Sequence, residues 1–154
     1  MKITACDKVF SKLVRARHAR AEGGEWVADC FTCGKTYPLH NLNAGHYIGR
    51  HMWGLRYHKW NVFPQCVPCN WTKEGNKVAF RERLKELYIK ENGEEKWIIF
   101  DSYRTEPPSF NNKPPLWQLA EGEFAKEFRN ELKELFEKCP GLKEAFSKKK
   151  KTTY

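Results

Sequence analysis

The stretch "NAGHYIGRHMWGLRYHKWNVFPQCVPCN" (residues 43–70) holds three of the chain's five histidines, three asparagines and a Cys-x-x-Cys pair. A second Cys-x-x-Cys pair lies before it, at Cys30 and Cys33. The two-residue spacing lets both sulfurs of a pair point around a tight turn toward one ion. The sequence therefore predicts one structural zinc ion, Zn²⁺, bound by Cys30, Cys33, Cys66 and Cys69. The alternative is a set of redox-active or idle thiols.

A zinc ion bound by both pairs would bring together the ends of the segment between them. The 32 residues between Cys33 and Cys66 must then leave the zinc site and return to it. A hairpin carrying His46, followed by a short helix from Pro68, would allow this and would let His46 face Asn70. Four thiolates leave no open position for water on the ion, so we expect the zinc to stabilise the fold and not to act in chemistry.

The hydrophobic pattern predicts helices on both sides of this region. A basic segment with Val9, Phe10, Leu13 and Val14 at helical spacing is expected to form a helix that ends at Gly23–Gly24. The other expected elements are a strand and knuckle over 25–38, an extended segment over 39–48, a short helix from Pro68 to Gly75, a helix that Asn76 caps and Asn92–Gly93 end, a helix or strand over 94–104, and a linker over 105–115.

An amphipathic helix is predicted over residues 116–139, because five apolar side chains fall on one stripe: Phe124, Phe128, Leu132, Leu135 and Phe136. The chain then divides into a zinc-stapled core with a basic N-terminal helix (1–93), a connector (94–115), a C-terminal helical extension (116–146) and a Lys-rich tail (147–154). The predicted fold class is a small α+β protein with one structural four-cysteine zinc and flanking α-helices.

The net charge of +9 lies partly in Lys148–Lys151 and is otherwise spread over the chain. Such an excess favours a polyanionic partner, most simply nucleic acid, although it also serves solubility. Arg15, on the basic helix, and Lys73 are candidate DNA contacts. No apolar run reaches 18 residues, so we expect no membrane span. The N-terminal residues lack the apolar region of a secretory signal, so we expect a cytoplasmic, reducing location in which cysteines bind metal.

The ordered motif "GHYIGR…LRYHKWNVFPQCVPCNWTKEGN" resembles the phage recombination proteins of the NinG (Rap) type, which are themselves similar to HNH, or His-Me finger, endonucleases. The resemblance covers roughly residues 5–92. It rests on Gly45-His46-Tyr47, Arg50, Arg56-Tyr57, Asn61-Val62, Gln65-Cys66, Cys69-Asn70 and Gly75-Asn76. It implies a ββα-metal (HNH-like, treble-clef-like) core and a phage endonuclease that acts in the host cell on branched or recombination-intermediate DNA.

The resemblance also implies a role for individual residues. His46 would be the general base that takes a proton from the attacking water, which requires a neutral imidazole. Asn70 would bind a catalytic Mg²⁺ or Mn²⁺ through its oxygen. Asn61 would fix the hairpin loop through backbone hydrogen bonds. Arg50 and Arg56 would hold phosphate, because a guanidinium matches the geometry of phosphate oxygens.

The second protein ligand of that cation stays open. Many HNH enzymes carry an acidic ligand directly before the catalytic histidine, and this chain has Gly45 there. Asn43 is one candidate, but on a strand its side chain would point away from that of His46. Glu74 is another, because residues 70 and 74 would share a face of the short helix.

Two other classes of function compete with the nuclease. The same zinc core could grip DNA without cutting it, which the missing acid before His46 keeps open. The amphipathic helix could instead dock an interaction partner or serve in an inhibitor protein, if its stripe is exposed. A homodimer is a further possibility, because symmetric resolution of a DNA junction requires two active sites.

Overall fold

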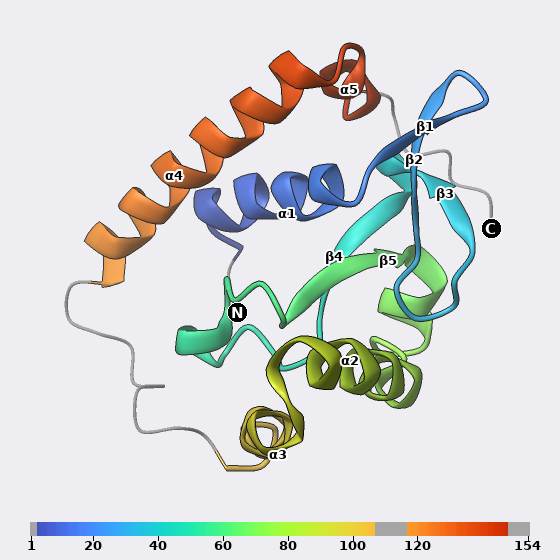
Figure 1. The fold of residues 1–154 in the computed structure, drawn as a ribbon. Helices are drawn as coiled ribbons and strands as arrows, with labels where there is room; N and C mark the ends of the chain where they lie inside the picture. The colour runs from blue at the N-terminus through green and yellow to red at the C-terminus, as the bar shows by residue number, and fades with distance from the viewer. Residues whose placement is uncertain (1–2, 107–116, 148–154) are drawn as a thin grey trace.

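The computed structural model describes residues 3–106 and 117–147, and these form a mixed α+β fold (Figure 1). The helices are α1 (Ala5–Arg17), α2 (Lys77–Asn92), α3 (Glu94–Ser102), α4 (Trp117–Lys138) and α5 (Leu142–Ala145). The strands are β1 (Arg20–Glu22), β2 (Glu25–Asp29), β3 (Thr36–Pro38), β4 (Leu42–His46) and β5 (Val62–Cys66). Short helical turns are η1 (Leu39–Asn41), η2 (Trp53–Leu55) and η3 (Pro68–Thr72), the last a π-helix.

The N-terminal helix is shorter than the sequence predicts. Thr4 and Asp7 form a capping box at its start, and it ends at Arg17. The expectation that it runs to Gly23–Gly24 is wrong, because residues 20–22 form β1 and pair antiparallel with β2. Both glycines have positive φ, 58° and 79°, and make the two-residue turn of this hairpin. The glycine pair therefore joins two strands instead of ending a helix.

The β4–β5 hairpin is the centre of the molecule. The two strands pair antiparallel from Leu42–Cys66 to His46–Val62, so the strand that ends at Cys66 runs back along the strand that carries His46. In Figure 1, α1 and α4 lie on one side of this pair and α2 and α3 on the other. A separate three-stranded sheet, β1–β2–β3, carries the first cysteine pair in the turn after β2.

Two hydrophobic clusters hold the helices in place. The first lies between α1, α4, α5 and the strands, and includes Phe10, whose ring centroid is 4.9 Å from that of Phe128. The second is rich in aromatic residues and packs α2 and α3 against the loop after β4, with Tyr47, Phe80 and Trp97 buried in it. The segment 94–104, whose pattern fits a helix or a strand, is thus largely the packed helix α3. The predicted connector, residues 94–115, therefore starts with a helix that packs in this cluster.

The C-terminal amphipathic helix packs on α1. Phe128 and Leu132 are buried, Leu135 and Phe136 pack partly buried against the same cluster, and Phe124 is 36% exposed. Because most of the stripe is covered within the same chain, the interaction-protein alternative loses its main support. The linker residues 107–115 and tail residues 148–154 lie outside the described part of the chain. None of the described helices is both long and apolar enough to cross a membrane.

Candidate functional site

The four cysteines of the two pairs converge as the spacing predicts. Cys30 and Cys33 lie in the turn after β2, Cys66 ends β5, and Cys69 lies in η3. Their sulfur atoms all lie within 4.8 Å of one another, so the group could hold a zinc ion. Burial raises the pKa of Cys66 to about 12, and a thiol of this kind ionises when a bound cation compensates its charge.

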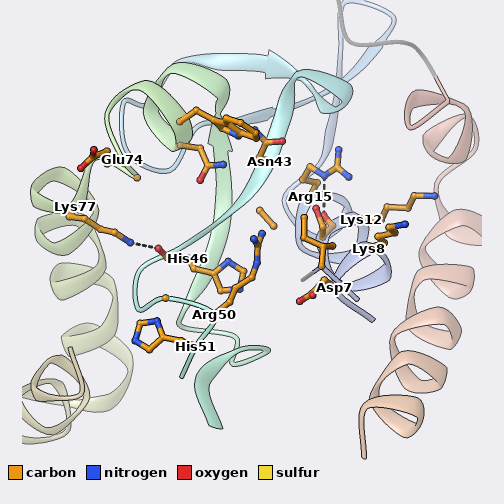
Figure 2. A pocket seen from close by; sticks show the side chains of 17 residues that line it. Asp7, Lys8, Lys12, Arg15, Asn43, His46, Arg50, His51, Glu74 and Lys77 are labelled. Atoms are coloured by element: carbon orange, nitrogen blue, oxygen red, sulfur yellow. Dashed lines mark hydrogen bonds between the residues drawn. The ribbon is translucent and has the colours of Figure 1, made fainter. Parts of the chain in front are cut away.

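A cleft of about 1160 Å³ lies between α1, β4, the loop after β4 and the start of α2 (Figure 2). Polar side chains make up most of its lining, including six of the candidate site residues named above. The polar residues are Asp7, Lys8, Ser11, Lys12, Arg15, Asn43, His46, Arg50, His51, Asn70, Glu74 and Lys77, together with Ile3, Ala44, Gly49, Trp71 and Gly75. Figure 2 shows the α1 residues on one wall, Glu74 and Lys77 on the other, and His46 and Arg50 between them.

His46, at the end of β4, is held as a neutral imidazole. Its Nε2 lies 3.1 Å from the carbonyl oxygen of Arg56. A carbonyl can only accept, so Nε2 carries the proton and Nδ1 is left as the acceptor of the ring. Burial, with a further contribution from the positive charge of Arg50, lowers the pKa of His46 from 6.5 to about 4. An imidazole that is neutral near pH 7 and has one free acceptor nitrogen is in the protonation state that a general base requires.

Arg56 is a correction to the sequence prediction. Its side chain is fully buried, and its Nε and Nη2 donate to the carboxylate of Asp7 on α1. The guanidinium carbon also lies 4.6 Å from the ring centroid of Trp53. A side chain without exposed surface does not reach a phosphate, so the predicted DNA contact of Arg56 is wrong. Arg56 instead ties the loop after His46 to α1, and this contact explains its place in the motif.

Asn61, just before β5, holds the loop between the strands. Its Nδ2 donates to the carbonyl oxygens of Ile48 and Leu55, both at 2.9 Å, and its Oδ1 accepts from the backbone N–H of Ile48 at 2.7 Å. Asn61 is fully buried, so these three bonds satisfy an amide that has no access to water. These are the backbone contacts that the resemblance implies. Asn61 is not among the residues that line the cleft, so it lies behind the cleft and supports the loop.

Oxygen ligands for a cation are present but sparse in the cleft. The amides of Asn43 and Asn70 and the carboxylate of Glu74 all line it. Glu74 lies beyond η3 with a left-handed φ of 48°, so the shared helical face expected for residues 70 and 74 is not what brings them together. Asn43 and His46 are three residues apart on β4, and side chains at this separation point to opposite faces of a regular strand. Both nevertheless line the cleft, and His46 lies at the strand end, where the chain turns toward Arg50 (Figure 2).

These donors fit a hard divalent cation of the Mg²⁺ class, which prefers oxygen ligands and often keeps several waters. Within residues 3–106 and 117–147, the cysteine group is the one cluster of three or more His, Cys, Asp or Glu ligands. A cation in the cleft would therefore depend on amides and on substrate oxygens as much as on Glu74.

The position before His46 has no room for a side chain. A Cβ on Gly45 would lie 1.8 Å from Oε1 of Gln65, a residue that is itself fully buried. Gln65 is fixed because its Nε2 donates to the carbonyl oxygen of Gly75 and to Oγ1 of Thr32, which links the two cysteine-bearing turns. The space directly before His46 is thus filled by Gln65, and position 45 offers no side chain as a ligand.

Positive charge dominates the lining. Lys8, Lys12 and Arg15 project from α1, and Arg50 and Lys77 complete the set. Arg15 donates to the carbonyl oxygens of Leu39 and Leu42, and burial lowers its pKa to about 10. Arg50 is half-buried, and its Nε makes no hydrogen bond within the described residues. Lys73 is exposed outside the lining, so its proposed DNA contact stays a prediction.

Lys77 is a cleft residue that the sequence interpretation missed, and Trp71 is one that tryptophan chemistry would assign to core or zinc-site packing. Lys77 donates to the carbonyl oxygens of His46 and Tyr47, which ties α2 to the strand end that carries the histidine. Trp71 is adjacent to Asn70 and is 73% exposed. The exposure of Trp71 contradicts a role in core packing.

The family model described as "Bacteriophage Lambda NinG protein" matches residues 3–106 of the chain. The match contains α1, both sheets, the cysteine group, α2 and α3, and it ends before α4. No curated protein and no solved structure matches the chain.

Proposed function

The chain belongs to the family of the bacteriophage lambda NinG protein, and from this premise we propose that it is a metal-dependent DNA endonuclease of the HNH type. The substrate proposed is branched or recombination-intermediate DNA, in line with a phage recombination-related role. The observation that carries the proposal is the state of His46: a neutral imidazole, fixed through Nε2, with Nδ1 free in a cationic cleft.

In the proposed reaction, a water molecule attacks phosphorus while Nδ1 of His46 takes its proton. The bond from phosphorus to the leaving oxygen then breaks, and that oxygen is protonated from solvent. Arg50 and Lys12 would hold the phosphate oxygens; both line the cleft, and neither forms an ion pair with a carboxylate among the described residues. A divalent cation bound by Asn70, with Asn43 or Glu74, would stabilise the negative charge of the leaving oxygen.

The wall of α1 supports DNA as the partner. Lys8 and Lys12 are one helical turn apart, and Arg15 continues the row along the cleft (Figure 2). A row of cations over a helix can follow a phosphate backbone, which carries one charge per phosphate. Two cuts in a junction require two sites, so the homodimer stays part of the proposal.

The test is cleavage of a labelled panel (four-way junction, flap, single strand and linear duplex) by the zinc-loaded chain with Mg²⁺ or Mn²⁺. We expect wild type and His51→Ala to cut and His46→Ala to lose cleavage while it still folds and binds DNA. His51 is the matched control, because it lines the same cleft but is exposed. Equal cleavage by wild type and His46→Ala would show that His46 is not the base.

A binding module on the same scaffold is the second candidate function. It is favoured by one observation: the carboxylates in the lining are Asp7 and Glu74, and Asp7 is already paired with Arg56. Such a protein would bind DNA with a steep salt dependence through the same cations. A zinc-loaded wild type that binds the panel but cuts none of it with either cation would establish this function instead.

A further inference from the structure

Among the tryptophans whose side chains the structure describes, Trp71 is the exposed one. Its relative exposure is 73%, whereas Trp60 and Trp97 are buried and Trp26 and Trp53 are half-buried. The ring of Trp71 makes no hydrogen bond and no ring contact within the described part of the chain. A large aromatic side chain left in water is informative, because its burial would stabilise the fold.

The surroundings of Trp71 indicate what covers it. It lines the cleft together with its neighbour Asn70, and Lys12 and Arg50 supply positive charge to the same lining. Ile3, 53% exposed, adds a second apolar side chain. A cleft whose lining contains both cations and an exposed indole matches a nucleotide, which has an anionic phosphate and a flat aromatic base.

We propose that Trp71 is a specificity-determining residue that stacks on an unpaired base next to the phosphate bound in the cleft. The inference rests on the proposed function, since it takes DNA as the ligand. In an intact duplex each base is stacked on its neighbours and its face is not available. Bases at junctions, flaps, bulges and single strands can present a face to an aromatic ring. Trp71 would thus select DNA with unstacked nucleotides over linear duplex.

The uncharged side chain of Trp71 distinguishes this role from phosphate binding. An indole carries no charge, so it contributes to the affinity for bases and not to the electrostatic attraction of the backbone. The cations account for binding to any DNA, and the indole accounts for the preference among DNA structures. Loss of the indole should therefore weaken binding to unpaired DNA and leave the salt dependence unchanged.

The experiment measures the affinity of the full zinc-loaded chain for three labelled DNAs of one sequence: single strand, duplex with an unpaired bulge, and intact duplex. Trp71→Ala should lose about 5- to 150-fold in affinity for the first two, the equivalent of about 1–3 kcal/mol. Its affinity for intact duplex should change less than about 2-fold, since phosphate contacts stay. Trp71→Phe should keep most of the affinity, because phenylalanine also stacks.

Val78→Ala is the matched control, because Val78 is also 73% exposed but does not line the cleft. It should behave as wild type on all three DNAs. Equal affinities of wild type and Trp71→Ala on the bulged DNA, or an equal loss on all three, would overturn the role of Trp71.

Cleavage is measured in parallel. If the wild type cuts DNA and Trp71→Ala binds all three DNAs as the wild type does, this inference alone is removed. If the wild type binds unpaired DNA selectively but cuts none of it, the inference is kept and the proposed nuclease is removed. A wild type that binds no DNA removes both.

Discussion

The Nε2 of His46 lies 3.1 Å from the backbone carbonyl of Arg56, whose own side chain is bound by Asp7 of α1. The proton position on the histidine therefore depends on a helix far away in sequence. Asp7 holds Arg56, Arg56 holds its carbonyl in place, and the carbonyl fixes the ring. This chain of contacts links the N-terminal helix to the proposed general base.

The protonation of His46 gives the first prediction. Because burial lowers its pKa to about 4, the ring should stay neutral from pH 8 to about pH 5, with the proton on Nε2. Nitrogen-detected NMR of the imidazole reports the tautomer directly. The unfolded chain binds this proton near pH 6.5, so acidification from pH 6.5 to about 4 should destabilise the fold by up to about 3 kcal/mol. His46→Gln should lose this part of the pH dependence. A ring that protonates near pH 6.5 in the folded protein would contradict the prediction.

The Asp7–Arg56 pair gives the second. The side chain of Arg56 is fully buried, so Asp7→Ala leaves its charge uncompensated and should reduce the free energy of unfolding by about 3–5 kcal/mol. Chemical denaturation of the zinc-loaded protein measures this. The double variant Asp7→Ala/Arg56→Met should recover part of the loss, because it removes both charges. Arg17→Ala is a suitable comparison, since the Arg17–Glu131 pair is partly exposed and should cost about 1 kcal/mol or less. Similar losses for both pairs would contradict the buried geometry.

The salt dependence of DNA affinity separates two arginines that look alike in sequence. Arg50→Ala should reduce the slope of log affinity against log salt by about one unit, because its guanidinium lies in the cleft. Arg56→Met should leave the slope unchanged, because its guanidinium is buried on Asp7. The measurement is fluorescence anisotropy over a range of salt, on variants shown to be folded. An Arg56 variant with the flatter slope would restore Arg56 as a phosphate contact.

Removal of the metal from the cysteine group should unfold the chain. Structural zinc contributes about 10–16 kcal/mol of binding free energy in small zinc domains, and this becomes folding free energy. We expect one zinc per chain by elemental analysis, loss of helical circular dichroism on chelation, and the same loss in Cys66→Ser. Cys139→Ser is the matched control, because Cys139 lies outside the cluster. A Cys66→Ser chain that keeps zinc and structure would rule out the four-thiol site.

Gly45→Ala should destabilise the protein by about 1–3 kcal/mol, because the added methyl group meets the buried Oε1 of Gln65. Pairing the change with Gln65→Ala should relieve the overlap, at the cost of the hydrogen bonds to Gly75 and Thr32. Thermal unfolding of the single and double variants tests the coupling. Additive effects of the two changes would show that the two side chains do not compete for this space.

The predictions that succeeded rest on local chemistry. Two Cys-x-x-Cys pairs can meet around one ion in few ways, and their convergence brings β4, β5 and η3 together with His46 and Asn70 on one cleft. Helix periodicity likewise identified the stripe of α4, although it could not name α1 as the surface that covers it.

The predictions that failed depend on tertiary packing. Charge alone does not say whether an arginine points outward or inward, and Arg56 points inward because Asp7 lies across from it. Gly23–Gly24 fits a helix end and a hairpin turn equally well until a partner strand is known. Asn76 begins α2 as expected, but with a left-handed φ of 47° its side chain donates to the sulfur of Cys69 instead of capping the helix.

The position of α4 has a consequence for synthesis of the protein. Glu121 accepts hydrogen bonds from Thr4 and Tyr57, and Phe128 packs on Phe10, so the last long helix fixes the first one. The ribosome releases α1 and both cysteine pairs well before α4. The wall that carries Lys8, Lys12 and Asp7 is therefore secured only after α4 has left the ribosome and packed on α1.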